Sequence, residues 1–202
     1  MKLYTGMGPN PRVVTIAISE LGADVEQVAV DLMGGENRKD EHLARNPAGQ
    51  LPTLETDEGS FISEITAIVE YLDEKVGGAL LGSNAEERGE TRMWARRIDL
   101  NILEPLANGF RNAEGLQLFE NRIHVIPQAA DDFKQIAQEQ LVKLDGLIEG
   151  REFICGDRFT LADILLFAFL EFGGQVGQPL DPKCGHVQAW YERVASRPSI
   201  AG

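Results

Sequence analysis

The stretch Leu51-Pro52-Thr53-Leu54-Glu55, with Ser60-Phe61-Ile62 close behind it, decides the fold of this chain. Both runs have the composition of short strands, and Asp57-Glu58-Gly59 between them is typical of a tight turn. A helix should follow at once, because apolar residues then recur at helical spacing and Ser63 is a good N-cap. Its apolar positions are Ile65, Ile68, Val69 and Leu72. A hairpin that leads into an amphipathic helix predicts a small α/β domain.

The residues before this hairpin continue the alternation of strands and helices. Pro11 suits the first position of a helix, where its missing N–H costs nothing, and Gly22 suits the helix end. The elements expected are a strand at Lys2–Thr5, a helix from Pro11 to Gly22, a strand at Val25–Asp31 and a short helix around Asp40–Arg45. The order β-α-β-α-β-β-α predicts an α/β domain over residues 1–76.

Residues 77–84 have the composition of a linker, since they begin with Gly77-Gly78 and end with Ser83-Asn84. Beyond them almost nothing has the pattern of a strand, and we expect residues 85–202 to form an all-helical domain without strand pairing beyond residue 90. The helical patterns cover Ala85–Asn112, with a break near Pro105 and Gly109, then Gln128–Glu149, Leu161–Phe172 and His186–Ser196.

A helix start is encoded sharply in Gly156-Asp157-Arg158-Phe159-Thr160-Leu161-Ala162-Asp163. Thr160 can cap the helix, and Asp163, three residues later, can accept a hydrogen bond from the Thr160 N–H, as in a capping box. The helix that follows is apolar on nearly every side, which predicts a buried central helix.

The composition excludes several classes of function. The 202 residues include 19 Lys+Arg against 32 Asp+Glu, a formal charge of −13, which argues against binding to nucleic acid or to an anionic membrane surface. No segment approaches 18 consecutive apolar residues, and the first residues lack the apolar core of a signal peptide. Cys155 and Cys184 form neither a disulfide framework nor a metal cluster. We expect a soluble cytoplasmic protein that carries no metal.

Three stretches together resemble the cytosolic glutathione transferases, and the resemblance covers the whole chain. Asn46-Pro47-Ala48-Gly49 is similar to the family's Asn-Pro-x-Gly segment, which leads to a cis-proline, here Pro52. Ser63–Ile68 resembles its Glu-Ser-x-Ala-Ile turn, and Gly156–Asp163 resembles its buried capping box. The N-terminal motifs resemble those of bacterial-type members that are nu-like or phi-theta-like. Residues 9–22 in particular resemble the nu-like and yeast-prion-type members, which place an asparagine where Asn10 stands. The resemblance implies a thioredoxin-like N-terminal domain, an all-helical C-terminal domain and a homodimer.

The resemblance also implies glutathione as co-substrate and a set of residues that bind it. Leu51, before the cis-proline, would offer its N–H and C=O to the peptide, and Glu64 would accept from the ammonium group. The glycyl carboxylate would lie near a polar and basic group of side chains. Ile65 stands where the family has a serine, so one hydroxyl donor is missing. The implied glutathione-binding residues are Asn37, Arg38, Gln50, Leu51, Pro52, Glu64 and Ile65.

The residue that activates the thiol is left open between Asn10 and Tyr4. The usual serine position aligns with Gly8, which has no side chain, and some members place an asparagine where Asn10 stands. An amide can donate to a thiolate but cannot accept its proton. Tyr4 is the other hydroxyl near this region, and Asn10 could instead form only an Asx turn before Pro11.

Three functions remain in competition. The first is a transferase that binds glutathione, stabilises its thiolate and presents it to an apolar electrophile or a peroxide. The second is a ligand-binding or interaction protein without catalysis, which Gly8 and Ile65 favour. The third is a disulfide reductase that uses two glutathione molecules, because the N-terminal domain has no cysteine.

Overall fold

A computed structural model describes residues 1–201 and divides the chain into two compact units. The first comprises residues 1–81 together with Pro198–Ile200, and the second comprises residues 82–197 with Ala201. Each unit is described by itself below.

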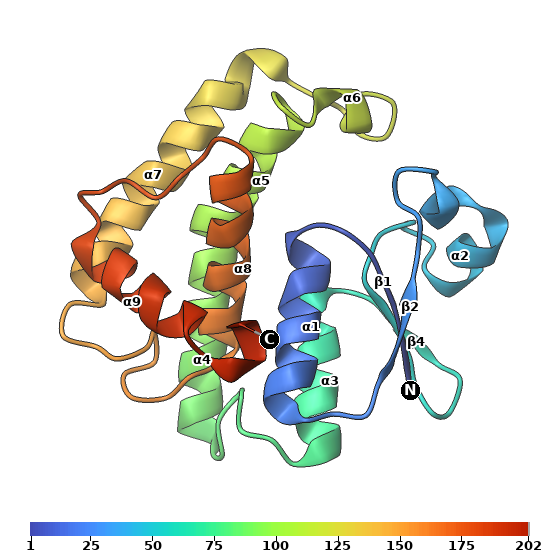
Figure 1. Cartoon of the computed structure of the whole chain (residues 1–202), viewed down its shortest axis with the longest axis horizontal. Coiled ribbons are helices and arrows are strands. Elements are labelled where there is room, and N and C mark those ends of the chain that lie inside the picture. The colour runs from blue at the N-terminus through green and yellow to red at the C-terminus, as the bar shows by residue number, and fades with distance from the viewer. Residues whose placement is uncertain (202) are drawn as a thin grey trace. The chain divides into compact units, whose positions relative to one another are not determined.

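The first unit is a four-stranded sheet with helices on both faces. The strands lie in the order β2-β1-β3-β4, with β1 and β2 parallel and the other neighbours antiparallel. Helices α1 and α3 lie on one side of the sheet and α2 on the other (Figure 1). The elements are β1 Lys2–Thr5, α1 Pro9–Leu21, β2 Glu26–Ala29, a 3₁₀ turn Glu36–Arg38, α2 Asp40–Arg45, β3 Thr53–Glu55, β4 Phe61–Ile62 and α3 Ile65–Val76. The predicted thioredoxin-like class is confirmed.

The two faces of the sheet carry separate apolar cores. Leu3 and Leu54 pair across β1 and β3, and both are fully buried on the face covered by α1 and α3. Side chains alternate along a strand, so Tyr4 lies on the opposite face, where it packs with Val30 and Leu51. The helices contribute Val13, Val14, Ile16, Ala17, Ile68, Val69 and Leu72. The second core places Tyr4 and Leu51 in one cluster.

Two helix starts differ from the sequence prediction. Helix α1 begins at Pro9 rather than Pro11, after Gly8 at φ 110°, a conformation that favours glycine. Asn10 therefore lies inside the first helical turn. Helix α3 begins after Glu64, which occupies the N-cap position at φ 71°, so Ser63 is not the cap. Serine is the better capping residue, which is why Ser63 was predicted, but the turn after β4 places Glu64 at the start of the helix.

Residues 198–200 pack with the first unit. An Arg12 guanidinium N–H donates to the Ile200 carbonyl over 3.0 Å, and the Ser199 hydroxyl donates to the Glu20 carboxylate over 2.5 Å. The Ile200 side chain is buried. The short helix α10, Pro198–Ala201, thus bonds at both ends of α1.

The second unit is built from helices. Its longest elements follow the predicted patterns, but the first is continuous: α4 passes into α5 through a π-helical turn, Asp99–Leu103, instead of breaking near Pro105. The helices are α4 Ala85–Ile98, α5 Glu104–Arg111, α6 Leu116–Phe119, a 3₁₀ turn Pro127–Ala129, α7 Ala130–Leu147, α8 Leu161–Gln175 and α9 Gly185–Ala195.

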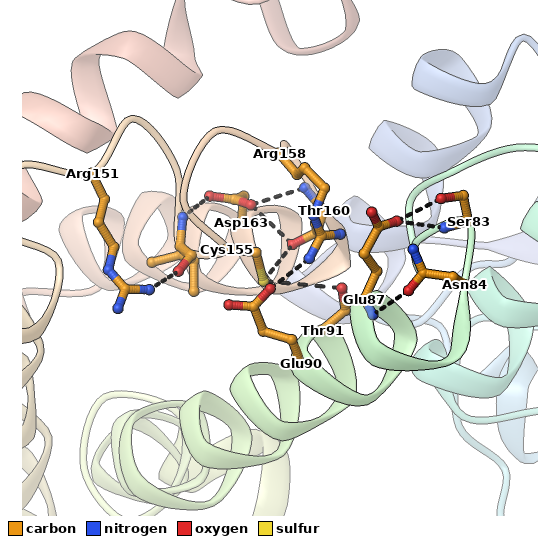
Figure 2. Close-up of polar contacts among 11 residues, drawn as sticks. Ser83, Asn84, Glu87, Glu90, Thr91, Arg151, Cys155, Arg158, Thr160 and Asp163 are labelled. Atoms are coloured by element: carbon orange, nitrogen blue, oxygen red, sulfur yellow. Dashed lines mark hydrogen bonds and ion pairs between the residues drawn. The ribbon is translucent and has the colours of Figure 1, made fainter.

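Asp163 is the polar centre of the second unit. It is fully buried at the start of α8 and completes the predicted capping box by accepting from the Thr160 N–H over 2.9 Å (Figure 2). Its carboxylate also accepts from the Ile154 N–H at 2.9 Å and from the Trp190 indole N–H at 2.8 Å. Burial raises the pKa of Asp163, and these hydrogen bonds oppose the shift. One side chain therefore joins a loop, α8 and α9.

The loop before α8 contains the unit's β-pairing. Two isolated bridges join Phe153 to Gly156 and Cys155 to Arg158, so the expectation of no pairing beyond residue 90 is wrong here, although no named strand forms among described residues 82–201. Arg158 also reaches Glu90 of α4 over 2.7 Å (Figure 2). Burial raises the pKa of the Cys155 thiol. The bridges shape a turn that carries the capping residues.

Candidate functional site

The strand register brings three segments to one end of the sheet. Tyr4 pairs with Thr53, so the residues after β1 lie beside those before β3. Leu54 pairs with Ile62, so the residues after β4 also lie beside the start of β3. This end of the sheet therefore combines the start of α1, the Gln50–Pro52 segment and Glu64.

Asn10 is the second residue of α1 and is half-buried. No hydrogen bond among described residues uses its side chain, so the Asx turn considered for it is not formed. The first turn of α1 contains no acidic residue that would neutralise the positive end of the helix dipole. Its amide is therefore available as a donor at a helix N-terminus.

Tyr4 has its hydroxyl engaged elsewhere. The hydroxyl donates to Glu55 Oε2 over 2.8 Å, and the Arg45 guanidinium lies 4.2 Å from the ring centroid. Burial, and then the hydrogen bond to Glu55, raise the pKa of Tyr4, while the Arg45 charge opposes them. A tyrosine that donates to a carboxylate is a poor donor for a thiolate. The geometry therefore favours Asn10 of the two candidates.

Leu51 presents an unused backbone. The predicted cis peptide bond before Pro52 is present, and the Leu51 side chain is buried with Tyr4 and Val30. Neither its N–H nor its C=O takes part in a backbone hydrogen bond among the described residues. An extended peptide can therefore pair with Leu51 as an added strand.

Buried polar side chains hold the loop that carries Leu51. Asn37 is 3% exposed and donates one amide N–H to the Gly49 carbonyl over 2.6 Å, so it lies behind the loop and holds it. Asn46 accepts from the Ala48 N–H at 3.1 Å, an Asx turn, and donates to the Gln50 carbonyl at 3.0 Å. Sequence reasoning quoted Asn46 within a motif but missed this role.

The sequence predicted no role for His42. It is 1% exposed in α2, and its Nε2 lies 3.1 Å from the Gln50 carbonyl oxygen. The Asn-Pro-x-Gly spacing was a usable signal for Asn46, whereas a single histidine in a short helix carries none.

Arg38 and Gln50 are exposed beside this loop. Gly49, at φ 62°, lies where an added Cβ would come within 3.1 Å of the Asn37 carbonyl oxygen and 3.5 Å of Arg38 Cδ, which places Arg38 against the loop. Arg38 makes no ion pair among residues 1–201. Its guanidinium is thus free to bind a carboxylate.

Glu64 adds an acceptor shortly after β4, the strand that pairs with β3 on the side away from β1. It is exposed and is the non-glycine residue with positive φ among those described. Strained backbone of this kind clusters at ligand sites. Ile65, the first residue of α3, is half-buried and supplies no hydroxyl.

The part of the chain that the structure describes offers neither a metal-binding cluster nor a membrane-spanning helix. No group of three or more His, Cys, Asp or Glu side chains there is arranged to hold a metal ion. None of the helices in residues 1–201 combines the length and apolar composition needed to cross a bilayer. Cys155 and Cys184 are both buried within the second unit.

Comparison with known proteins identifies the family. The model of the glutathione S-transferase N-terminal domain matches residues 1–74, and that of the C-terminal domain matches residues 115–198. Glutathione S-transferase 2 of Saccharomyces cerevisiae is 34% identical over 204 residues, which cover 97% of this chain and 85% of that protein.

Solved structures extend the likeness to the fold. Gtt2 from Saccharomyces cerevisiae has a TM-score of 0.92 at 32% identity, with 100% of this chain and 99% of that chain covered. A glutathione S-transferase domain-containing protein from Marinobacter aquaeolei has a TM-score of 0.92 at 36% identity, with 99% and 100% covered. The chain therefore belongs to the glutathione S-transferase family.

Proposed function

We propose that this glutathione transferase activates its co-substrate by hydrogen bonding, with the Asn10 amide and the N-terminus of α1 stabilising the glutathione thiolate. The observation that carries the proposal is the half-buried Asn10 amide in the first turn of a 13-residue helix. This amide makes no hydrogen bond to any described residue. A donor and a helix dipole both favour the charged form of a thiol. The thiol proton leaves to solvent, because an amide cannot accept it.

The other groups of glutathione are paired with residues of complementary charge or hydrogen-bonding capacity. Its ammonium group pairs with Glu64, its cysteinyl peptide group pairs with the Leu51 N–H and C=O, and its glycyl carboxylate lies near Arg38 and Gln50. Arg38 is free of ion pairs among the described residues, and Glu64 is exposed. Because the chain carries 13 more acidic than basic residues, such a local basic group matters for an anionic ligand.

The reaction is a nucleophilic transfer. The thiolate forms a sulfur–carbon bond with an apolar electrophile, and the leaving group departs with its electron pair. With a peroxide, the thiolate sulfur attacks one oxygen, the O–O bond breaks, and the alkoxide leaves with the electron pair and takes a proton from water. A second glutathione then converts the sulfenic acid to the disulfide and releases water. Proximity and thiolate stabilisation supply the rate enhancement, without a covalent enzyme intermediate.

The two alternative functions are not favoured. Relatives that are 30–34% identical over nearly the whole chain carry the name glutathione S-transferase, as in yeast and in Escherichia coli. That speaks against a non-catalytic binding protein, and the disulfide reductase has no observation of its own. We further propose a cytoplasmic homodimer with a role in detoxification, for which sedimentation is the test of assembly.

The proposed function is tested by assaying wild-type protein with glutathione and an aryl halide, and separately with a hydroperoxide. We expect glutathione-dependent turnover with at least one of them and retention on immobilised glutathione. Retention without turnover on either, or on a disulfide, would mean a binding protein.

Glu64→Gln should weaken glutathione binding by roughly tenfold, the cost of replacing a charged hydrogen-bond acceptor by a neutral one at an exposed site. The substitution keeps side-chain length, and turnover at saturating glutathione should stay near the wild-type value. Titration calorimetry gives the dissociation constant. Glu74→Gln, an exposed change on the same helix, is the control. Equal affinity in both variants would remove Glu64 from the site.

A further inference from the structure

The peptide group between Gln50 and Leu51 is held from one side by three buried side chains. The Gln50 carbonyl oxygen lies 3.1 Å from His42 Nε2, 3.0 Å from Asn46 Nδ2 and 3.4 Å from Thr53 Oγ1. The three side chains are between 0% and 3% exposed. A carbonyl oxygen only accepts, so His42 Nε2 carries its proton and donates. Three donors on two lone pairs fix the direction of this carbonyl.

The direction of that carbonyl also fixes the Leu51 N–H. The cis bond falls after Leu51, so the Gln50–Leu51 peptide is trans, and a planar trans peptide directs its C=O and N–H to opposite sides. The Leu51 N–H therefore points away from the buried donors. Donation to the carbonyl also polarises the peptide and strengthens its N–H as a donor.

Burying His42 lowers the stability of the fold in a way that burying an apolar residue would not. Its Nδ1 atom is buried without a partner among the described residues, although the ring is 1% exposed. An unpaired buried nitrogen lowers stability, so a histidine here needs an explanation other than packing. Its bond to the Gln50 carbonyl provides one.

We propose that His42, Asn46 and Thr53 are positioning residues for glutathione, which aim and polarise the Leu51 N–H without touching the ligand. This rests on the proposed function, because Leu51 is there the partner of the cysteinyl peptide group. The side chains of His42 and Asn46 come from α2 and from the residue after it, so they couple the α2 region to the ligand-binding backbone.

The kinetic test compares His42→Phe, which fills the space without a donor, with His42→Gln, which restores one. Thr53→Val removes another donor at nearly constant shape. We expect the glutathione KM of His42→Phe to rise about tenfold, with kcat within about twofold, because uniform binding is lost. His42→Gln should recover most of the affinity, and Thr53→Val should show a smaller rise. Glu41→Gln, which breaks an exposed pair with Arg45 on α2, is the control.

A second readout separates this proposal from the function on which it rests. The amide resonance of Leu51 in glutathione-free protein should shift in His42→Phe and Thr53→Val but not in Glu41→Gln. If wild type neither binds nor uses glutathione, the proposed function fails, while the Leu51 resonance still tests the positioning. Folded His42→Phe and Thr53→Val proteins with a wild-type KM and Leu51 resonance overturn the proposal. An equal shift in Glu41→Gln does the same.

Discussion

Replacing Asn10 with alanine is expected to slow conjugation near neutral pH by about 10- to 100-fold, because the thiolate loses a charge-assisted hydrogen bond of roughly 1.5–3 kcal/mol. Glutathione affinity should change little, since in the proposed binding mode Glu64, Leu51 and Arg38 hold the rest of the molecule. Activity measured against pH should show the thiol pKa moving upward in Asn10→Ala. Asn10→Asp should slow conjugation more than Asn10→Ala does, because it places a carboxylate beside the thiolate and the two charges repel.

Tyr4→Phe is the matched comparison for Asn10→Ala. Because the Tyr4 hydroxyl donates to Glu55, its removal should lower stability by about 1 kcal/mol and leave turnover within about twofold. The reverse ordering, with Tyr4→Phe inactive and Asn10→Ala unaffected, would make Tyr4 the activating residue. If the pH profile of wild-type activity shows no thiol pKa below that of free glutathione, the thiolate mechanism is wrong.

Asp163→Ala is expected to lower the free energy of unfolding by about 3–5 kcal/mol, because four buried donors lose their acceptor. The donors are the N–H groups of Ile154 and Thr160, the Thr160 hydroxyl and the indole N–H of Trp190. Urea unfolding followed by circular dichroism measures the loss, and Trp190 fluorescence reports on the same site.

Asp157→Ala provides the control for Asp163→Ala. It removes a carboxylate from the same loop, but its side chain is exposed, so the expected change is within about 0.5 kcal/mol. Asp163→Asn keeps one acceptor oxygen and should fall between the two. A loss below about 1 kcal/mol in Asp163→Ala would show that the buried donors find other partners.

The sequence was informative where one local rule governs an element. Thr160 and Asp163 at capping-box spacing predicted the start of α8, and apolar periodicity predicted its burial. The hairpin of β3 and β4 followed from alternation and a turn signal. In each case the residues that decide the structure are neighbours in the chain.

The sequence was less informative where tertiary geometry decides. A positive φ at Glu64 and a helix start at Pro9 depend on how the chain leaves the sheet. The burial of His42 depends on the loop around Gln50, whose carbonyl oxygen contacts the His42 ring. The choice between Asn10 and Tyr4 likewise depended on Glu55, far away in sequence, which binds the Tyr4 hydroxyl.

The packing of Pro198–Ile200 with residues 1–81 affects when the first unit can be completed during synthesis. Residues 82–197 are translated between its two parts. At about 5–20 residues per second, this delays the last piece by on the order of ten seconds. The nascent unit must spend that interval with the α1 surface under Ile200 uncovered. A chimera that joins residues 1–81 of one protein to the rest of another would combine α1 with residues 198–200 of a different parent. Its first unit is then complete only if residues 198–200 come from the parent that supplies α1.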